Sequence, residues 1–384
     1  MSKTKEDDIE IEKQLRVLNK KPVKTIVTKI DDIIDCVDIY KQPAFDNPLL
    51  KKHKIQMSPD SIPGLRTNKT ISSSSILGVL QKEICPPGTV PIRRTTKEDL
   101  MNAKKIIKKT RLIHANNTYP NAPPANQQFV YAEEIIEGKQ YFGGTAYMSL
   151  HDMSIYRDEL STSQIWLLNG PHEQINSIEF GIMHDPLLFG DGRARLFGSW
   201  TADGHQTTGC YNIMCPGFVQ VNRGITFGYQ FHTGIYGKGV FDIYLMVRRA
   251  PLSKDWWLSI GSNAETSEPI GYWPNEIFTH LANSASNLRY GGFASALYRR
   301  STPPMGNGYL PQLTDFTRTA YMVKMKYVNE TGHTVNLDRR SMQIHRSTTT
   351  ECYNLMLANP LGDLDITMAF GGPGGTITFG KEDL

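Results

Sequence analysis

The rear part of the chain is dominated by short stretches in which apolar and polar residues alternate. Between 241 and 247 the odd positions are Phe, Ile, Leu and Val, and between 321 and 327 they are Tyr, Val, Met and Tyr. A period of two is typical of strands with one face in a core. Similar stretches occur at 129–134, 143–150, 163–168, 176–182, 194–200, 217–230 and 375–379, separated by turn-forming residues. Many short strands with tight turns predict an all-β domain, either a sandwich or a barrel.

Helical periodicity is found in three stretches. Residues 5–19 and 274–287 place apolar residues three and four apart, and Pro274 opens the second stretch. The clearest helix is predicted at 95–113, where Thr95 and Glu98 have the spacing of a capping box ahead of an apolar stripe. Its polar face carries several lysines, which we interpret as a solvated face because cations are favourable near a helix C-terminus.

A stretch rich in Asn and Pro marks the boundary between the two patterns. Residues 114–127 have the composition of an exposed, flexible linker. We therefore predict four parts, which are an N-terminal tail and helix at 1–22, a small α+β domain at 23–113, the linker at 114–127 and a β-domain at 128–384.

Composition and charge exclude several classes of protein. No run of about 18 apolar residues occurs, so we expect no membrane partner. Residues 1–120 carry 23 Lys and Arg against 14 Asp and Glu, whereas the remainder carries 19 against 24. We hypothesise that the basic front part is attracted to the acidic rear part, which makes their association salt-sensitive. Nucleic acid is not expected as a partner, because acids are interspersed and no recognised motif occurs.

The cysteines and sequons bear on cofactors and compartment. Cys210 and Cys215 are spaced to close a small disulfide loop, and no second Cys or His pair indicates a zinc site, so we expect no metal or other cofactor. Sequons begin at Asn68, Asn116 and Asn329 and favour a secretory route, although sequons also arise by chance. The N-terminus lacks the apolar segment of a signal peptide. Either the protein stays inside the cell or the sequence lacks its true start.

Most signatures of catalysis are missing, but one glutamate stands out. There is no P-loop, no Gly-x-Ser-x-Gly elbow and no His-Glu-x-x-His. In a strand at 175–181, Ile178 and Phe180 would face one side and Glu179 the other. A carboxylate buried beneath aromatic residues can serve general acid–base chemistry if a second carboxylate stands opposite. The alternative, which spacing alone favours, is an exposed strand glutamate.

Long strings of residues resemble the neprosin family of plant glutamic peptidases. In the front part they are IIDCVDIYKQPAFD at 33–46 and CPPGTVPIRRT at 85–95. In the rear part they are SQIW at 163–166, NSIE at 176–179, GCYN at 209–212 and GYWP at 271–274. The resemblance covers nearly everything from about residue 24 to residue 375.

The resemblance implies a fold, an activity and partners. It implies a two-sheet antiparallel β-sandwich catalytic domain, preceded by a small α+β activation domain that keeps the zymogen silent until it is removed at low pH. Family members cleave after proline in acid, using two glutamates that face each other across a groove. One carboxylate activates water, and the other polarises the carbonyl and protonates the leaving nitrogen. The implied partners are a proline-containing substrate and the chain's own activation domain, and the implied location is secreted or vacuolar.

Only one of the two catalytic glutamates carries over. The first maps onto Glu179, but the family string Trp-Gly-Gly-Glu reads Tyr-Gly-Gly-Phe here, which puts Phe293 at the second position. Phenylalanine can neither hold a proton nor bind water, and we consider Glu134, Asp203 and Glu276 as replacements. Two functions stay open: an acidic prolyl endopeptidase made as a zymogen, or a degenerate member that binds peptides or has a structural role. A sandwich lectin is a third reading, supported only by aromatic content.

The resemblance also bears on the remaining cysteines. The sequence leaves the pairing of Cys36, Cys85 and Cys352 open, and one pairing within the front domain joins Cys36 to Cys85. The C-terminal cysteine that would partner Cys352 in the family is absent, which leaves Cys352 unpaired.

Overall fold

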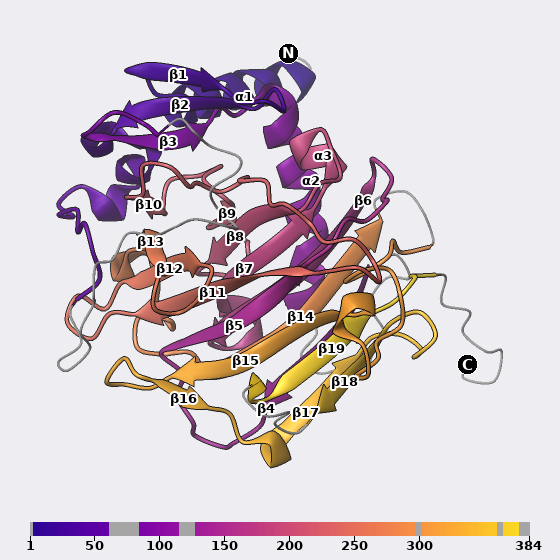
Figure 1. Ribbon diagram of the computed structural model, residues 1–384. Coiled ribbons are helices and arrows are strands. Elements are labelled where there is room, and N and C mark those ends of the chain that lie inside the picture. Colours follow the sequence, from indigo (N-terminus) through magenta and orange to yellow (C-terminus); the bar gives the residue numbers. More distant parts are fainter. Residues whose placement is uncertain (1–2, 61–83, 115–126, 297–300, 359–363, 376–384) are drawn as a thin grey trace.

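A computed structural model describes residues 3–60, 84–114, 127–296, 301–358 and 364–375 of the chain. It shows a small front domain resting against one end of a large, two-layered β-domain (Figure 1). Most of the predicted linker at 114–127 and of the predicted strand at 375–379 lies outside the described residues. Within the described parts, none of the helices is both long and apolar enough to cross a membrane.

The front domain combines two helices with a three-stranded antiparallel sheet. Helix α1 spans Lys3–Leu18 and helix α2 spans Lys97–His114. The sheet has the order β1-β2-β3 and consists of β1 (Lys24–Val27), β2 (Ile33–Asp38) and β3 (Thr89–Arg93). Short 3-10 turns follow β2, and Pro43 and Pro48 stand at the starts of two of them, where a missing N–H group costs nothing.

Helix α2 begins two residues later than the sequence pattern predicts. The backbone N–H of Thr96 donates to Asp99 Oδ2 at 2.9 Å, and the N–H of Asp99 donates to Thr96 Oγ1 at 3.0 Å. Thr95 instead exchanges two hydrogen bonds with the side chain of Asn19, at 2.8 and 2.9 Å. The predicted capping chemistry is therefore present one residue further along, because Asn19 engages the backbone of Thr95.

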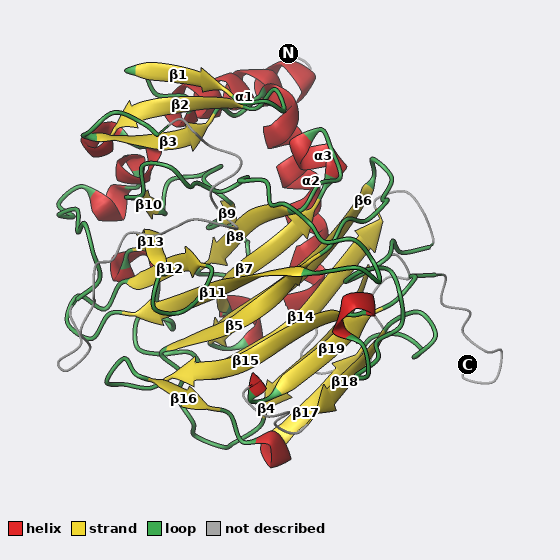
Figure 2. Cartoon of the chain, in the orientation of Figure 1, coloured by secondary structure: helices red, strands yellow, loops and turns green. Residues whose placement is uncertain are grey.

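Two antiparallel sheets form the β-domain, as Figure 2 shows. The nine-stranded sheet has the order β10-β13-β12-β11-β5-β15-β19-β18, with β16 added to β15, and the seven-stranded sheet has the order β17-β4-β14-β6-β7-β8-β9. The strands of the nine-stranded sheet are β5 (Gly143–Leu150), β10 (Val219–Gln220), β11 (Phe241–Arg249), β12 (Trp256–Gly261), β13 (Glu268–Trp273), β15 (Ala320–Val328), β16 (Thr334–Asn336), β18 (Asn354–Ala358) and β19 (Thr367–Gly371). Those of the seven-stranded sheet are β4 (Gln127–Glu134), β6 (Glu159–Asn169), β7 (Asn176–His184), β8 (Arg195–Thr201), β9 (Cys210–Tyr211), β14 (Asn287–Ala296) and β17 (Met342–Arg346). The predicted class, an antiparallel two-sheet sandwich preceded by a small α+β domain, is confirmed.

One apolar core lies between the two sheets, because apolar side chains occupy alternate strand positions. On β7 these are Ile178, Phe180 and Ile182, which belong to the same cluster as Leu245 of β11. Successive side chains of a strand point to opposite faces of its sheet. Glu179 therefore points away from the core, to the outer face of the seven-stranded sheet.

Two elements differ from the sequence-based expectation. The strand predicted at 217–230 is reduced to the two residues of β10, and the helix predicted at 274–287 is a single 3-10 turn at Asn275–Ile277. The side chain of Asn176 explains the second difference. Its Oδ1 accepts hydrogen bonds from three successive backbone N–H groups, those of Thr279, His280 and Leu281. These groups are thus engaged outside the i→i−4 pattern that a helix needs.

Candidate active site on the outer face of the seven-stranded sheet

Glu179 lies in the middle of β7 on the outer face. It is paired with Trp166 of β6 on one side and with Ser199 of β8 on the other. Only 7% of the residue is exposed. The exposed strand glutamate that spacing alone favours is therefore not what the structure contains.

Two polar side chains hold the Glu179 carboxylate. Gln164 of β6 donates from Nε2 to Oε2 of Glu179 at 2.8 Å, and Ser177 donates from Oγ to Oε1 at 3.4 Å. A buried carboxylate is costly unless hydrogen bonds replace its water. The amide of Gln164 therefore compensates part of the cost of burial and fixes the direction in which the carboxylate points.

Gln164 stands between two glycines on the neighbouring strands. It is paired with Gly181 of β7 and with Gly291 of β14. A Cβ atom would lie 2.1 Å from the carbonyl oxygen of Ser163 at Gly181, and 2.1 Å from that of Val130 at Gly291. Neither position accepts a side chain unless the backbone moves, so the two positions directly opposite Gln164 carry no side chain.

Phe293 lies on the same face but not next to Glu179. It is paired with Thr162 of β6 and Phe129 of β4, which puts it two strands and four residues from Glu179. At ordinary strand spacings this is roughly 16 Å between Cα atoms. Phe293 is 5% exposed and belongs to an apolar cluster with Phe129. A buried ring thus occupies the position to which the resemblance assigns the second acid, and Gln164 lies between that ring and Glu179.

The three acids considered as replacements are engaged elsewhere. Glu134 accepts a hydrogen bond at 3.0 Å from the hydroxyl of Tyr141, a core residue. Asp203 accepts hydrogen bonds within the turn that follows β8. Glu276 lies 3.0 Å from Nδ1 of His53 in the front domain. Each carboxylate therefore has a structural role away from Glu179.

A row of polar and aromatic residues beside Glu179 was not predicted from the sequence. Trp166 is paired with Arg289 of β14, which in turn is paired with Glu133 of β4. Arg289 Nε donates to Glu133 Oε2 at 3.1 Å, and its guanidinium lies 4.7 Å from the centre of the Tyr131 ring. Tyr131 stacks on His345 of β17 at 4.9 Å between ring centres. Glu133 and Arg289 are 156 residues apart, so only the strand order brings this row together.

Helix α2 of the front domain packs on this outer face, behind the strands as Figure 1 presents them. Asn102 Nδ2 donates to the carbonyl oxygen of Leu187 at 2.9 Å, in helix α3 (Pro186–Phe189). Ala103 of α2 belongs to the same apolar cluster as Tyr211 and Phe293 of the sheet. The front domain therefore covers part of the face that carries Glu179.

A buried ion pair between the two domains has the opposite polarity to the net charges. Arg195 of β8, whose side chain is 0% exposed, binds Asp32 of the front domain at 2.5 Å and Asp191 at 2.7 Å. Arg93 of β3 also binds Asp32, at 3.2 Å. A carboxylate of the basic front part thus meets a cation of the acidic rear part. Salt-sensitive attraction between the net charges stays a prediction.

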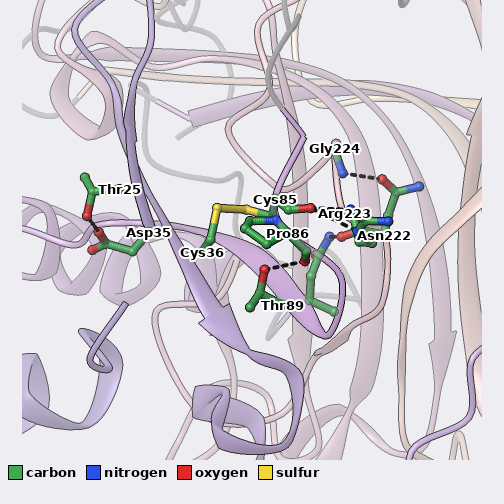
Figure 3. Close-up of a disulfide and its surroundings, with 10 residues drawn as sticks. Thr25, Asp35, Cys36, Cys85, Pro86, Thr89, Asn222, Arg223 and Gly224 are labelled. Carbon is green, nitrogen blue, oxygen red and sulfur yellow. Dashed lines mark hydrogen bonds between the residues drawn. A yellow bond between two sulfur atoms is a disulfide. The ribbon is translucent and has the colours of Figure 1, made fainter. Parts of the chain in front are cut away.

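A second link between the domains lies at the Cys36–Cys85 disulfide, which Figure 3 shows beside Arg223. Arg223 donates to the carbonyl oxygen of Cys85 from Nε at 2.9 Å and from Nη2 at 2.6 Å. The backbone N–H of Cys85 donates to the carbonyl oxygen of Arg223 at 3.0 Å. Cys85 is therefore held by the disulfide within the front domain and by hydrogen bonds to Arg223 of the β-domain.

The remaining cysteines have separate environments. Cys210 and Cys215 form the small-loop disulfide, and Cys352 is a free thiol. In the described part of the chain, no group of three or more His, Cys, Asp or Glu side chains is arranged to hold a metal ion.

Comparisons with known proteins match most of the chain to two family models. A family model described as Neprosin matches residues 157–373, and a model described as Neprosin activation peptide matches residues 25–134. The chain is also similar to a crystal structure of Scytalido-glutamic peptidase with a peptide-based transition state analog, with a TM-score of 0.36 and 11% identity over 64% of this chain and 97% of that one. A structure of SCP-B, a member of the Eqolisin family of peptidases, in a complex with the tripeptide Ala-Ile-His has a TM-score of 0.33 and 9% identity over the same shares.

Proposed function

The chain belongs to the neprosin family, and from this premise we propose that it is a latent glutamic endopeptidase. In this proposal it cleaves proteins or peptides after proline at acidic pH, once its activation domain has been removed. The observation that carries the proposal is the buried Glu179, hydrogen-bonded to Gln164 on a sheet face that α2 packs against.

A single carboxylate beside an amide can hydrolyse a peptide bond. Glu179 takes a proton from a water molecule, whose oxygen then bonds to the carbonyl carbon of the substrate. The amide nitrogen of Gln164 has two hydrogens, so it can donate one to Glu179 and the other to the oxyanion that forms. Glu179 then passes its proton to the leaving nitrogen, the C–N bond breaks, and the carboxylate is restored.

The domain interface supports latency. The front domain is tied to the β-domain by the buried ion pair of Asp32 with Arg195, and its helix α2 packs on the face that carries Glu179. Release of the front domain would uncover that face.

The aromatic row beside the site supports a preference for proline. Trp166 is the direct cross-strand neighbour of Glu179, and Tyr131 stacks on His345 further along the same face. Proline-containing segments are commonly recognised by aromatic side chains, because the flat ring faces pack well against the pyrrolidine ring.

The two disulfides support a secreted or vacuolar location. Cys36–Cys85 and Cys210–Cys215 form and persist in oxidising compartments, whereas cytosolic thiols are kept reduced.

The test is an activity assay on the full chain, cut after folding at a protease site placed within residues 115–126. A quenched fluorescent peptide with one proline is digested between pH 3 and pH 7. We expect cleavage after proline by the natural chain, no cleavage by Glu179→Gln, and a fall of about 10²-fold or more for Gln164→Ala, which removes an oxyanion donor. Glu137→Gln, at an exposed turn, is the matched control. An unchanged rate for Glu179→Gln would refute the proposal.

A second function, peptide binding without hydrolysis, is favoured by one observation. Phe293 is a buried member of an apolar cluster at the position of the second acid. In that case the cut natural chain binds the peptide, as fluorescence anisotropy detects, but does not cleave it. Cleavage would then appear only in Phe293→Glu, and the Phe293→Leu variant serves as the control for loss of the ring alone.

A further inference from the structure

The tip of the hairpin between β15 and β16 carries one of the three sequons. Asn329, Glu330 and Thr331 follow directly after Val328, the last residue of β15. The chain turns back at Gly332, which has a φ of +84° that glycine adopts without strain. Glu330 and Thr331 are exposed and Asn329 is partly exposed. The other two sequons, at Asn68 and Asn116, lie outside the described residues.

Hydrogen bonds fix which end of the Asn329 amide faces the protein. Its Oδ1 accepts from Thr331 Oγ1 at 2.9 Å and from the backbone N–H of His333 at 2.9 Å. The backbone N–H of Asn329 donates to the carbonyl oxygen of His333, and the carbonyl oxygen of Asn329 accepts from the N–H of Gly332. Among the described residues, Nδ2 of Asn329 has no hydrogen-bond partner. The turn therefore uses the amide oxygen and leaves the amide nitrogen on the outside.

The hairpin is remote from the proposed active site. Strand β16 is paired with β15 of the nine-stranded sheet, whereas Glu179 lies on the seven-stranded sheet. In Figure 1, β16 lies at the lower edge of the molecule and the front domain at the upper edge. A group attached at this tip is thus on the sheet that does not carry Glu179.

The two disulfides point to the compartment in which such a group is added. Disulfides form in the secretory pathway, where asparagine side chains of Asn-x-Ser/Thr sequons receive oligosaccharides. Residue 330 is not proline, so the sequon satisfies the rule for its middle position.

We propose that Asn329 is an acceptor for N-linked glycosylation when the chain passes through the secretory pathway. Nδ2 of Asn329 bonds to C1 of a lipid-linked oligosaccharide, the bond between C1 and the pyrophosphate oxygen breaks, and the pyrophosphate leaves with the electron pair. Nδ2 loses one proton in the exchange. The hydroxyl of Thr331, which is bonded to the amide oxygen, belongs to the same three-residue recognition unit.

The test uses the full chain, produced behind a cleavable secretory leader in cultured eukaryotic cells. Treatment with peptide-N-glycosidase in ¹⁸O-water converts a glycosylated asparagine to labelled aspartate, which peptide mass spectrometry locates. We expect the label at position 329. Asn329→Asp keeps the oxygen acceptor of the turn but lacks the nitrogen, so its intact mass should fall by one glycan while its melting temperature stays unchanged. Thr331→Ser should keep the glycan and Thr331→Ala should lose it.

Two results would overturn the proposal. One is an unlabelled Asn329 peptide from secreted protein in which both disulfides are formed. The other is an identical glycan content in the natural chain and in Asn329→Asp.

Discussion

Replacement of Asp32 by alanine tests what holds the two domains together. Arg195 is fully buried and binds Asp32 of the front domain, Asp191 of its own domain and the carbonyl oxygen of Gly228. In Asp32→Ala the guanidinium keeps two of these three partners, but a buried cation loses its contact across the interface. Removing one member of a buried ion pair typically costs 3–5 kcal/mol. Because two acceptors remain, we expect a loss of about 3 kcal/mol.

Two assays measure this loss. Urea unfolding of the intact chain gives the free energy of unfolding, and Glu137→Ala, at an exposed turn, is the control. The chain cut within residues 115–126 gives the affinity of the two halves, which should fall by about 100-fold in Asp32→Ala, since 1.4 kcal/mol corresponds to tenfold. Buried pairs are weakly screened, so this difference should persist in 0.5 M salt, whereas attraction between net charges would be lost. A change of less than about 0.5 kcal/mol in Asp32→Ala would refute the reasoning, because surface substitutions have effects of that size.

Three further predictions concern titratable groups whose pKa the fold shifts. Burial raises the pKa of Asp185, the N-cap of α3, to about 7. The protonated carboxyl group contributes stability below pH 3.8, and this contribution is lost as the pH rises through 7. In calorimetry, Asp185→Asn should therefore raise the melting temperature at pH 8 but not at pH 4. Burial raises the pKa of Asp203, but hydrogen bonds from Thr207 and Thr208 outweigh it and lower this pKa to about 2. In urea unfolding, Asp203→Asn should lower the free energy of unfolding by about 1 kcal/mol at pH 7, after allowance for solvent screening, and leave it unchanged at pH 2. Burial and the neighbouring His184 lower the pKa of His151 to about 4. Neutral His151 therefore contributes stability above pH 6.5, which is lost as the pH falls through 4. The free energy of unfolding of His151→Gln should depend less on pH between these two values.

Much of the fold could be predicted because local patterns and tertiary packing agree. The alternation at 241–247 becomes β11, and the apolar stripe at 95–113 becomes α2, displaced by two residues at its start. The helix predicted at 274–287 fails for a reason that lies about 100 residues away, since Asn176 takes up the N–H groups that the helix would use. A periodic pattern reports what a segment can form, and a distant hydrogen-bond acceptor decides whether it does.

In the candidate site, too, the sequence predicts some features and not others. The direction of Glu179 follows from its two apolar neighbours on β7, so the sequence predicts it. Its bond to Gln164 depends on the pairing of β6 with β7, and the glycine at 291 depends on β14 lying on the other side of β6. Strand order depends on the packing of the whole domain, so it cannot be predicted from a local sequence pattern.

The outer face of the seven-stranded sheet has to satisfy two conflicting demands. Beneath an activation domain, a buried polar group is costly unless it is hydrogen-bonded, whereas hydrolysis needs a carboxylate that can exchange protons with water. In the proposed mechanism, Glu179 and Gln164 meet both demands, because their mutual hydrogen bond replaces water while the face is covered and would be shared with a substrate once it is open. A glutamate at 293 would stand between Thr162 of β6 and the ring of Phe129 of β4, and neither is an amide like Gln164. Phe293 instead packs in the apolar cluster that also contains Ala103 of α2, so in the proposed latent state its ring is covered together with Glu179.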